Sequence, residues 1–183
     1  KDSLESSFAH LPLDEMPDLK DNIAPYYYDW MAHPEYDDYW KSVCIEESHS
    51  NIDIPALNVG GWHDIFLGGT INNYMSMRDH GGTKSARNGQ RLVIGPWIHS
   101  GSPTNVSGLV NYGTRAASTA IDLPGIILRY YDHWLNGAEN GTDSEKPVRI
   151  FVMGANKWRY EDEWPIARAI ESKYYLHSKG KAN

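Results

Sequence analysis

Residues 56–64 read ALNVGGWHD and residues 91–99 read RLVIGPWIH, and these two stretches decide the fold. Each begins with a short apolar run and then reaches a Gly-Gly or Gly-Pro pair, which is typical of a buried strand that ends there. The chain between them is long enough for a right-handed crossover through a helix. The sequence therefore predicts two parallel strands, Ala56–Val59 and Arg91–Ile94, in one sheet of an α/β protein.

Helices are predicted on the amino-acid pattern around these strands. The stretch from Gly68 to Arg78 carries apolar residues at helical spacing, and Gly81-Gly82 provides a stop after it. Ser100–Ser118 is rich in glycine and serine and is predicted to be a loop. A further helix is expected from Pro124 to Leu135, because a proline suits the first turn and Gly137 follows the last.

The texture of the sequence changes at two places, near residue 53 and near residue 142. Residues 1–52 are rich in proline, aspartate, tyrosine and tryptophan, and the one helix that can be read there begins at Pro34. After residue 142 the pattern turns to alternating strands, with Val148–Val152 and Lys173–His177 as candidates. Three domains are therefore expected, with boundaries at 52/53 and 142/143.

Composition excludes several classes of protein. The 183 residues are 40% hydrophobic and 22% charged, which is globular usage. A net charge of −7 argues against a nucleic-acid or anionic-lipid partner, and no apolar run reaches the length of a membrane span. The single cysteine, Cys44, forbids an internal disulfide and a cysteine-ligated zinc site. No basic and then apolar leader opens the chain at Lys1, and the compartment is left open.

Two polar residues directly follow the predicted strands, Asp64 after the first and His99 after the second. The carboxyl ends of parallel strands meet at one rim of a sheet, so both side chains should face the same crevice. An aspartate beside a histidine can fix the imidazole tautomer and stabilise the imidazolium, as in hydrolase triads. Two plainer interpretations stay open: Asp64 as a helix cap, and His99 as an ordinary loop histidine.

A metal site is the other arrangement that these residues suggest. His63, Asp64 and His99 could be drawn as two histidines and one carboxylate, but no fourth ligand and no helical His-x-x-x-His accompanies them. Alternation along an extended segment turns His63 away from Asp64, which favours a structural or pocket-rim role. We therefore expect no metal and no cofactor.

Five segments of the chain resemble a known family in their order and their residues. They are HPEYDDYW (33–40), GGWHDIF (60–66), GPWIHS (95–100), YDHWLNG (131–137) and VRIFVMGANKWR (148–159). Together they resemble the X-prolyl dipeptidyl-peptidase and cocaine esterase family, the CocE/NonD serine hydrolases. A single GWxD or GPWxH would be weak evidence, whereas five segments in order cover nearly the whole chain.

The resemblance implies a Ser-Asp-His hydrolase in which Asp64 is the triad acid and His99 the general base. Phe66 matches an aromatic position that lines the acyl pocket, and Trp62 is assigned to substrate binding beside it, although a large aromatic at a strand end also suits the core. The implied organisation is a partial α/β-hydrolase fold, a parallel sheet with flanking helices. Its domains would be a helical cap remnant (1–52), the C-terminal half of the hydrolase domain (53–142) and the first strands of a jelly-roll β-sandwich (143–183).

The departure from the family is that no Gly-x-Ser-x-Gly elbow occurs in the 183 residues. The nucleophile is therefore expected upstream, in a missing N-terminal part of the same hydrolase, and the chain as given is catalytically incomplete. Family members that hold a substrate ammonium carry extra carboxylates after the triad acid, and here Ile65, Phe66 and Leu67 stand instead. The expected substrate is a small ester or amide, or an X-Pro peptide.

A second class of function is kept as the alternative. The aromatic-rich surface, with Tyr26–Tyr28 and Trp30, could hold a carbohydrate or a peptide without any chemistry. An elbow encoded upstream of Lys1 would favour the enzyme, and a natural start codon there would favour the binding module. Half a parallel sheet also leaves an unpaired edge and an uncovered apolar face, so the isolated chain is expected to self-associate as a homo-oligomer or to bind a hydrophobic dye.

Overall fold

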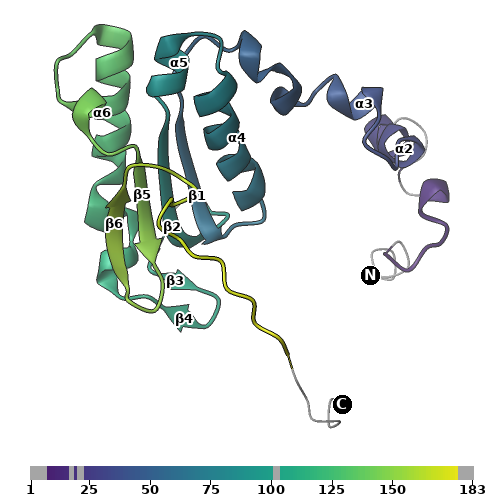
Figure 1. Cartoon of the computed structure of the whole chain (residues 1–183). Coiled ribbons are helices and arrows are strands. Elements are labelled where there is room, and N and C mark those ends of the chain that lie inside the picture. The colour runs from purple at the N-terminus through teal and green to yellow at the C-terminus, as the bar shows by residue number, and fades with distance from the viewer. Residues whose placement is uncertain (1–7, 17–18, 20–22, 101–103, 177–183) are drawn as a thin grey trace. The chain divides into compact units, whose positions relative to one another are not determined.

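A computed structural model of the chain describes residues 8–16, 19, 23–100 and 104–176 (Figure 1). It divides into two compact units, Lys1–Ser48 and His49–Asn183. The second unit holds a four-stranded sheet in the order β1-β2-β5-β6. Among the described residues, the strands are β1 (Leu57–His63), β2 (Arg91–Ile98), β3 (Val106–Ser107), β4 (Val110–Asn111), β5 (Val148–Val152) and β6 (Lys157–Glu161). The α-helices there are α2 (Pro25–Ala32), α3 (Asp38–Lys41), α4 (Leu67–His80), α5 (Lys84–Asn88) and α6 (Leu123–Asn136), and 3-10 helices occur as well.

In the first unit, the helix predicted to begin at Pro34 is wrong in its start. The carboxylate of Asp37 accepts a hydrogen bond from the backbone N–H of Tyr39 at 3.0 Å, so the side chain caps α3 and the helix begins one residue after it. The proline that does open a helix is Pro25, at the start of α2. The aromatic residues of this unit pack on one another, with the rings of Tyr26 and Trp30 5.0 Å apart.

The parallel crossover predicted from the sequence is confirmed. β1 and β2 pair in parallel, and α4 and α5 connect them. The helix expected from Pro124 to Leu135 is confirmed as α6, whose first turn Asp122 caps and which ends at Gly137 with φ of 69°. The predicted loop at Ser100–Ser118 is not wholly irregular, because the short hairpin of β3 and β4 lies within it.

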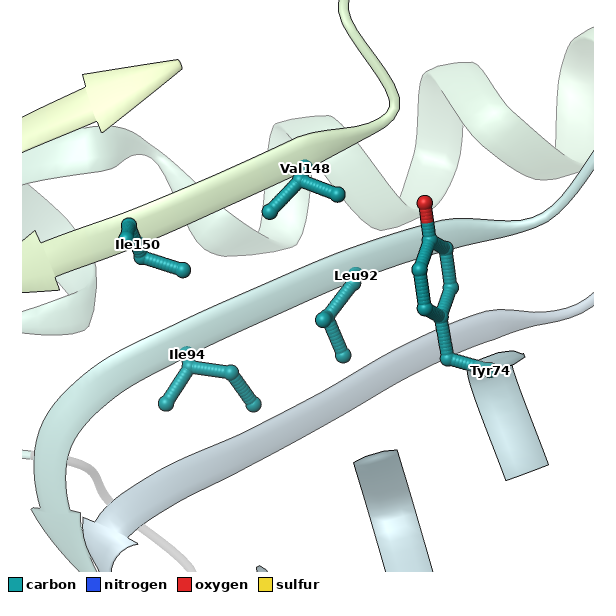
Figure 2. Close-up of a cluster of buried hydrophobic side chains, with 5 residues drawn as sticks. All are labelled: Tyr74, Leu92, Ile94, Val148 and Ile150. Atoms are coloured by element: carbon teal, nitrogen blue, oxygen red, sulfur yellow. The ribbon is translucent and has the colours of Figure 1, made fainter. Parts of the chain in front are cut away.

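Side chains of β2 point alternately to the two faces of the sheet. Helix α4 lies on one face and helix α6 on the other (Figure 1). Leu92 and Ile94 pack on one face with Val148, Ile150 and Tyr74 of α4, as Figure 2 shows. Val93, between them in the sequence, packs on the other face with the start of α6. A strand covered on both faces has to be apolar throughout, which explains the continuous apolar run that the sequence shows.

Strands β1 and β2 both continue beyond the glycines that were predicted to end them. β1 runs through Gly60 and Gly61 to His63, and β2 runs through Gly95 and Pro96 to Ile98. The register shifts on the way, because Gly61 lies opposite Gly95 whereas His63 lies opposite Ile98. β2 therefore holds one more residue than β1 in this interval, which is a β-bulge.

The expected start of a jelly roll after residue 143 is not confirmed. The predicted strand Val148–Val152 exists as β5, but it pairs in parallel with β2 and extends the same sheet. β6 follows it in antiparallel pairing, so the sheet is mixed. The strand predicted at Lys173–His177 is wrong for residues 173–176, which form neither strand nor helix, and His177 lies outside the described residues.

Candidate active site

Asp64 and His99 stand directly after the ends of β1 and β2, at the same edge of the sheet. Their side chains meet there: Nδ1 of His99 lies 3.2 Å from Oδ2 of Asp64. The carboxylate is sheltered, with 14% of its side chain exposed, whereas the imidazole is 64% exposed. One ring nitrogen thus faces the carboxylate, and most of the remaining imidazole is open to a reacting partner.

The bulge in β2 is what brings this pair into line. His63 lies opposite Ile98, so the next residues along the two strands are Asp64 and His99. If the pairing continued from Gly61 and Gly95 without a bulge, Ile98 would lie opposite Asp64. Because side chains alternate with a period of two along a strand, one residue of register decides which side chain the aspartate meets.

The second carboxylate oxygen of Asp64 holds the turn that leads into α4. Oδ1 accepts a hydrogen bond from the backbone N–H of Phe66 at 2.8 Å, and the backbone N–H of Asp64 donates to the carbonyl of Gly61 at 3.0 Å. The hydrogen bond from Phe66 and then that from His99 hold the pKa of Asp64 below its ordinary value, against the opposing effect of partial burial. The carboxylate therefore stays ionised and positioned at neutral pH.

This geometry bears on the two plain interpretations that the sequence left open. Asp64 does bond to a backbone N–H ahead of a helix, as a capping residue would, and its other oxygen at the same time faces His99. The two roles are compatible because a carboxylate has two oxygens to share between them. His99 is not an isolated loop histidine, since its Nδ1 faces an ionised carboxylate.

Phe66 completes the local group of predicted site residues. Its ring meets the imidazole of His99 edge-on, with centroids 4.9 Å apart and planes at 80°, and it is 57% exposed. A hollow of about 190 Å³ opens beside the pair. Its lining is largely apolar apart from the pair itself: Val59, Gly60, Gly61, Asp64, Trp97, Ile98, His99 and Ser100.

Trp62, the fourth predicted site residue, lies apart from this group. Its ring packs with Trp164 at 5.8 Å against the core on the α4 side of the sheet. Its Nε1 donates a hydrogen bond to the carbonyl of Phe151 at 2.7 Å. The structure thus brings Asp64, His99 and Phe66 together, and the assignment of Trp62 to substrate binding stays a prediction.

Gly60 and Gly61 line the hollow, and the sequence reasoning treated them only as a strand end. A Cβ at Gly61 would lie 2.2 Å from the carbonyl oxygen of Trp97, so only glycine allows β1 and β2 to approach this closely. The available signal was glycine within an apolar strand pattern, which often marks close approach of another backbone.

A larger hollow, of about 480 Å³, lies elsewhere in the second unit, around Arg91 at the start of β2 and the charged side chains of Arg78 and Glu163. It does not include Asp64 or His99. In open α/β sheets the ligand site is at the carboxyl ends of the strands, so the smaller hollow is the candidate site.

A known protein family matches the region of the chain that contains the pair. The model of the X-Pro dipeptidyl-peptidase (S15 family) matches residues 6–101, just over half of the chain, including both Asp64 and His99. The chain belongs to the X-Pro dipeptidyl-peptidase (S15) family. The resemblance seen in the five sequence segments is thereby confirmed.

Relatives of this S15 family member are hydrolases. Cocaine esterase from Rhodococcus sp. (strain MB1 Bresler) is 30% identical over 173 residues, which are 94% of this chain and 29% of that protein. A solved α-amino acid ester hydrolase is 25% identical with a TM-score of 0.58, over 77% of this chain and 23% of its own. The chain therefore spans less than a third of the length of these relatives.

A CocE/NonD family hydrolase from Staphylococcus aureus shares the fold, with a TM-score of 0.56 at 16% identity over 91% of this chain and 26% of that one. At this identity the likeness concerns the fold alone. Among the residues that the structure describes, none of the helices has the length and apolar character needed to cross a membrane.

Proposed function

We propose that this S15 family member is part of a serine hydrolase that cleaves an ester or amide. Asp64 and His99 are two members of its Ser-Asp-His triad. The observation that carries the proposal is the 3.2 Å approach of His99 Nδ1 to an ionised carboxylate at the carboxyl edge of a parallel sheet. The relatives named as an esterase and an ester hydrolase support the class of reaction. The third member, a serine, is proposed to come from a part of the protein outside these 183 residues.

The chemistry assigned to each side chain follows from where its atoms lie. With Nδ1 turned to Asp64, Nε2 of His99 is the nitrogen left to accept the serine hydroxyl proton while the serine oxygen attacks the substrate carbonyl. The imidazolium so formed is stabilised by the Asp64 carboxylate, and Nε2 then returns the proton to the leaving group as its bond to the acyl carbon breaks. Water repeats both steps on the acyl-enzyme and releases the acid.

The residues after Asp64 point to a neutral acyl group. Ile65, Phe66 and Leu67 are uncharged, Ile65 is 83% exposed, and the Phe66 ring stands beside His99. An apolar wall next to the general base favours uncharged ester or amide substrates over a substrate ammonium, which needs a carboxylate partner. We propose Phe66 as a contact for the acyl part of such a substrate.

The decisive test is Asp64→Asn in the intact hydrolase that contains this chain. The amide keeps the shape of the carboxylate but can donate where Nδ1–H must also donate, so it favours the unproductive tautomer of His99. Serine proteases lose about 10⁴-fold in kcat from the equivalent change, and we expect at least about 10²-fold here on a short aryl ester.

Asp162→Asn is the matched control, because Asp162 is an exposed carboxylate that pairs with Lys146 at 2.9 Å, away from the site. It should leave kcat unchanged. A hydrolase in which Asp64→Asn stays within a few-fold of the parent would contradict the proposal. A parent enzyme that hydrolyses X-Pro anilides but not aryl esters would leave the triad standing and redefine the substrate, and Asp64→Asn would then be tested on the anilide.

A further inference from the structure

A hydrogen bond lies one residue before the proposed triad acid. Nε2 of His63 is 2.7 Å from the hydroxyl of Tyr112, and the two rings have centroids 5.8 Å apart. His63 is the last residue of β1 and exposed, whereas Tyr112 is only 8% exposed and follows β4 directly. The bond therefore connects the end of the strand that carries Asp64 to the segment that follows His99.

Tyr112 is a firmly held partner for this bond. Its ring stands edge-on to Phe151 of β5 with centroids 6.1 Å apart, and both are buried in one cluster with Ala116. The carbonyl of Phe151 accepts the indole N–H of Trp62 at 2.7 Å. Two consecutive residues of β1, Trp62 and His63, are thus tied to the same buried cluster immediately before Asp64.

The same segment is also tied to the other strand of the site. Ser107 donates from Oγ to the carbonyl of Pro96 at 2.5 Å, and Nε1 of Trp97 donates to the carbonyl of Ala116 at 2.7 Å. Pro96 and Trp97 are in the bulged part of β2, just before His99. Residues 104–117, which we name the clasp, therefore bond to the last residues of both strands, just before Asp64 and His99.

The clasp matters because the strand register selects Asp64 and His99 as neighbours but the ladder of the sheet ends before it reaches them. The ladder between β1 and β2 reaches its last partners at His63 and Ile98, so Asp64 and His99 lie one step beyond it. Their Nδ1–Oδ2 separation of 3.2 Å is long for a charge-assisted hydrogen bond. Small movements of either strand end consequently change whether this bond forms at all.

We propose that His63 and Tyr112 are positioning residues for the Asp64–His99 pair: their hydrogen bond sets the end of β1 against the clasp and so holds the carboxylate at the right distance from the imidazole. The inference rests on the proposed function. Neither residue lines the hollow beside the pair, so their effect passes through the alignment of the pair. Losing the bond should lower kcat and leave KM unchanged, because substrate binding does not depend on it.

The test uses five variants of the intact hydrolase. His63→Ala and Tyr112→Phe each remove one partner of the bond, and the double variant removes both. His63→Gln places an amide near the position of Nε2 and is the conservative rescue. Tyr130→Phe is the matched control, because it deletes another buried hydroxyl, which donates to the carbonyl of Gly89 at 3.2 Å, from a helix remote from the pair.

We expect kcat to fall three- to tenfold in His63→Ala and in Tyr112→Phe, with KM within twofold. The double variant should fall no further than the worse single variant, because both singles break one bond. His63→Gln should stay within twofold of the parent, and Tyr130→Phe should lower the melting temperature without lowering kcat. The rate of phosphonylation by a serine-directed phosphonate should fall in parallel with kcat.

Unchanged kcat in both single variants, additive losses in the double variant, or an equal loss in Tyr130→Phe would each overturn the positioning role. If His63→Ala does not fold, Tyr112→Phe decides alone, since it deletes a single oxygen atom. Asp64→Asn is measured alongside. If Asp64→Asn also keeps full activity, the proposed function has failed. If Asp64→Asn is inactive while the His63 and Tyr112 variants keep the activity of the parent, only the positioning proposal has failed.

Discussion

Gly61→Ala is the substitution for which the structure gives the sharpest expectation. A Cβ at this position would lie 2.2 Å from the carbonyl oxygen of Trp97 and 2.6 Å from its carbonyl carbon. Both atoms belong to the backbone and cannot rotate away, so β1 and β2 must separate by roughly 1 Å to restore van der Waals contact. Overpacking of this kind costs about 1–3 kcal/mol in unfolding free energy.

The same displacement reaches the site because Asp64 follows Gly61 closely and His99 follows Trp97. A 1 Å misplacement can cost about 10²-fold in rate, and we expect a fall in kcat of that order in the intact hydrolase. For a chain of this size the lost stability corresponds to a fall of roughly 2–12 °C in Tm. Steady-state hydrolysis of an aryl ester and thermal unfolding followed by circular dichroism measure the two effects.

Gly69→Ala is the matched control. It makes the same chemical change in the first turns of α4, where an added Cβ would meet nothing within 4 Å, so it should keep kcat and stabilise the helix by up to about 1 kcal/mol. If Gly61→Ala melts at the parent temperature with the parent kcat, or if Gly69→Ala is equally damaging, the close approach of the two strands is not what organises the site.

Two further predictions concern stability and the isolated chain. Glu161→Gln should lower the urea midpoint at pH 7, and the difference from the parent should shrink as the pH falls below the ordinary glutamate pKa. Hydrogen bonds from Arg168 depress the pKa of the buried Glu161 carboxyl, so its contribution to stability is present above the ordinary glutamate pKa and is lost as the pH falls through the lowered one. Equal midpoints at pH 7 would contradict this. The 183-residue chain alone should hydrolyse aryl esters no faster than buffer, since it carries no Gly-x-Ser-x-Gly elbow, and turnover that a serine-directed phosphonate inhibits would show that the serine is within it.

The local part of the fold and the main pair of the site could be predicted from sequence. Two apolar runs separated by a helical pattern suffice for a parallel crossover, and the rule that ligands meet the carboxyl ends of strands brings Asp64 and His99 to one rim. The partner of Val148–Val152 could not be predicted, because alternation indicates a strand without indicating its neighbour. β5 pairs with β2, across the whole of α6 in the sequence.

Long-range contacts account for the rest of what the sequence did not show. The hydrogen bond between His63 and Tyr112 joins residues 49 positions apart, and no local sequence pattern predicts that the two residues meet. The bulge in β2 was hidden for a different reason. Gly95-Pro96 is a strong stop signal in any sequence, yet here the strand continues because the backbone of Trp97 fits against Gly61.

The bulge also makes the site sensitive to the number of residues in this short interval. Between Gly95 and Ile98 the number of residues matters more than their identity, because this number decides which residue of the β2 segment lies opposite Asp64. If the bulge is kept, deleting one residue here would bring Ser100 opposite Asp64 and inserting one would bring Ile98 there, while composition, charge and most core contacts stay intact. Insertions and deletions in this interval should therefore be far less tolerated than substitutions, whereas the loop after His99 can vary in length without changing which residue faces the aspartate.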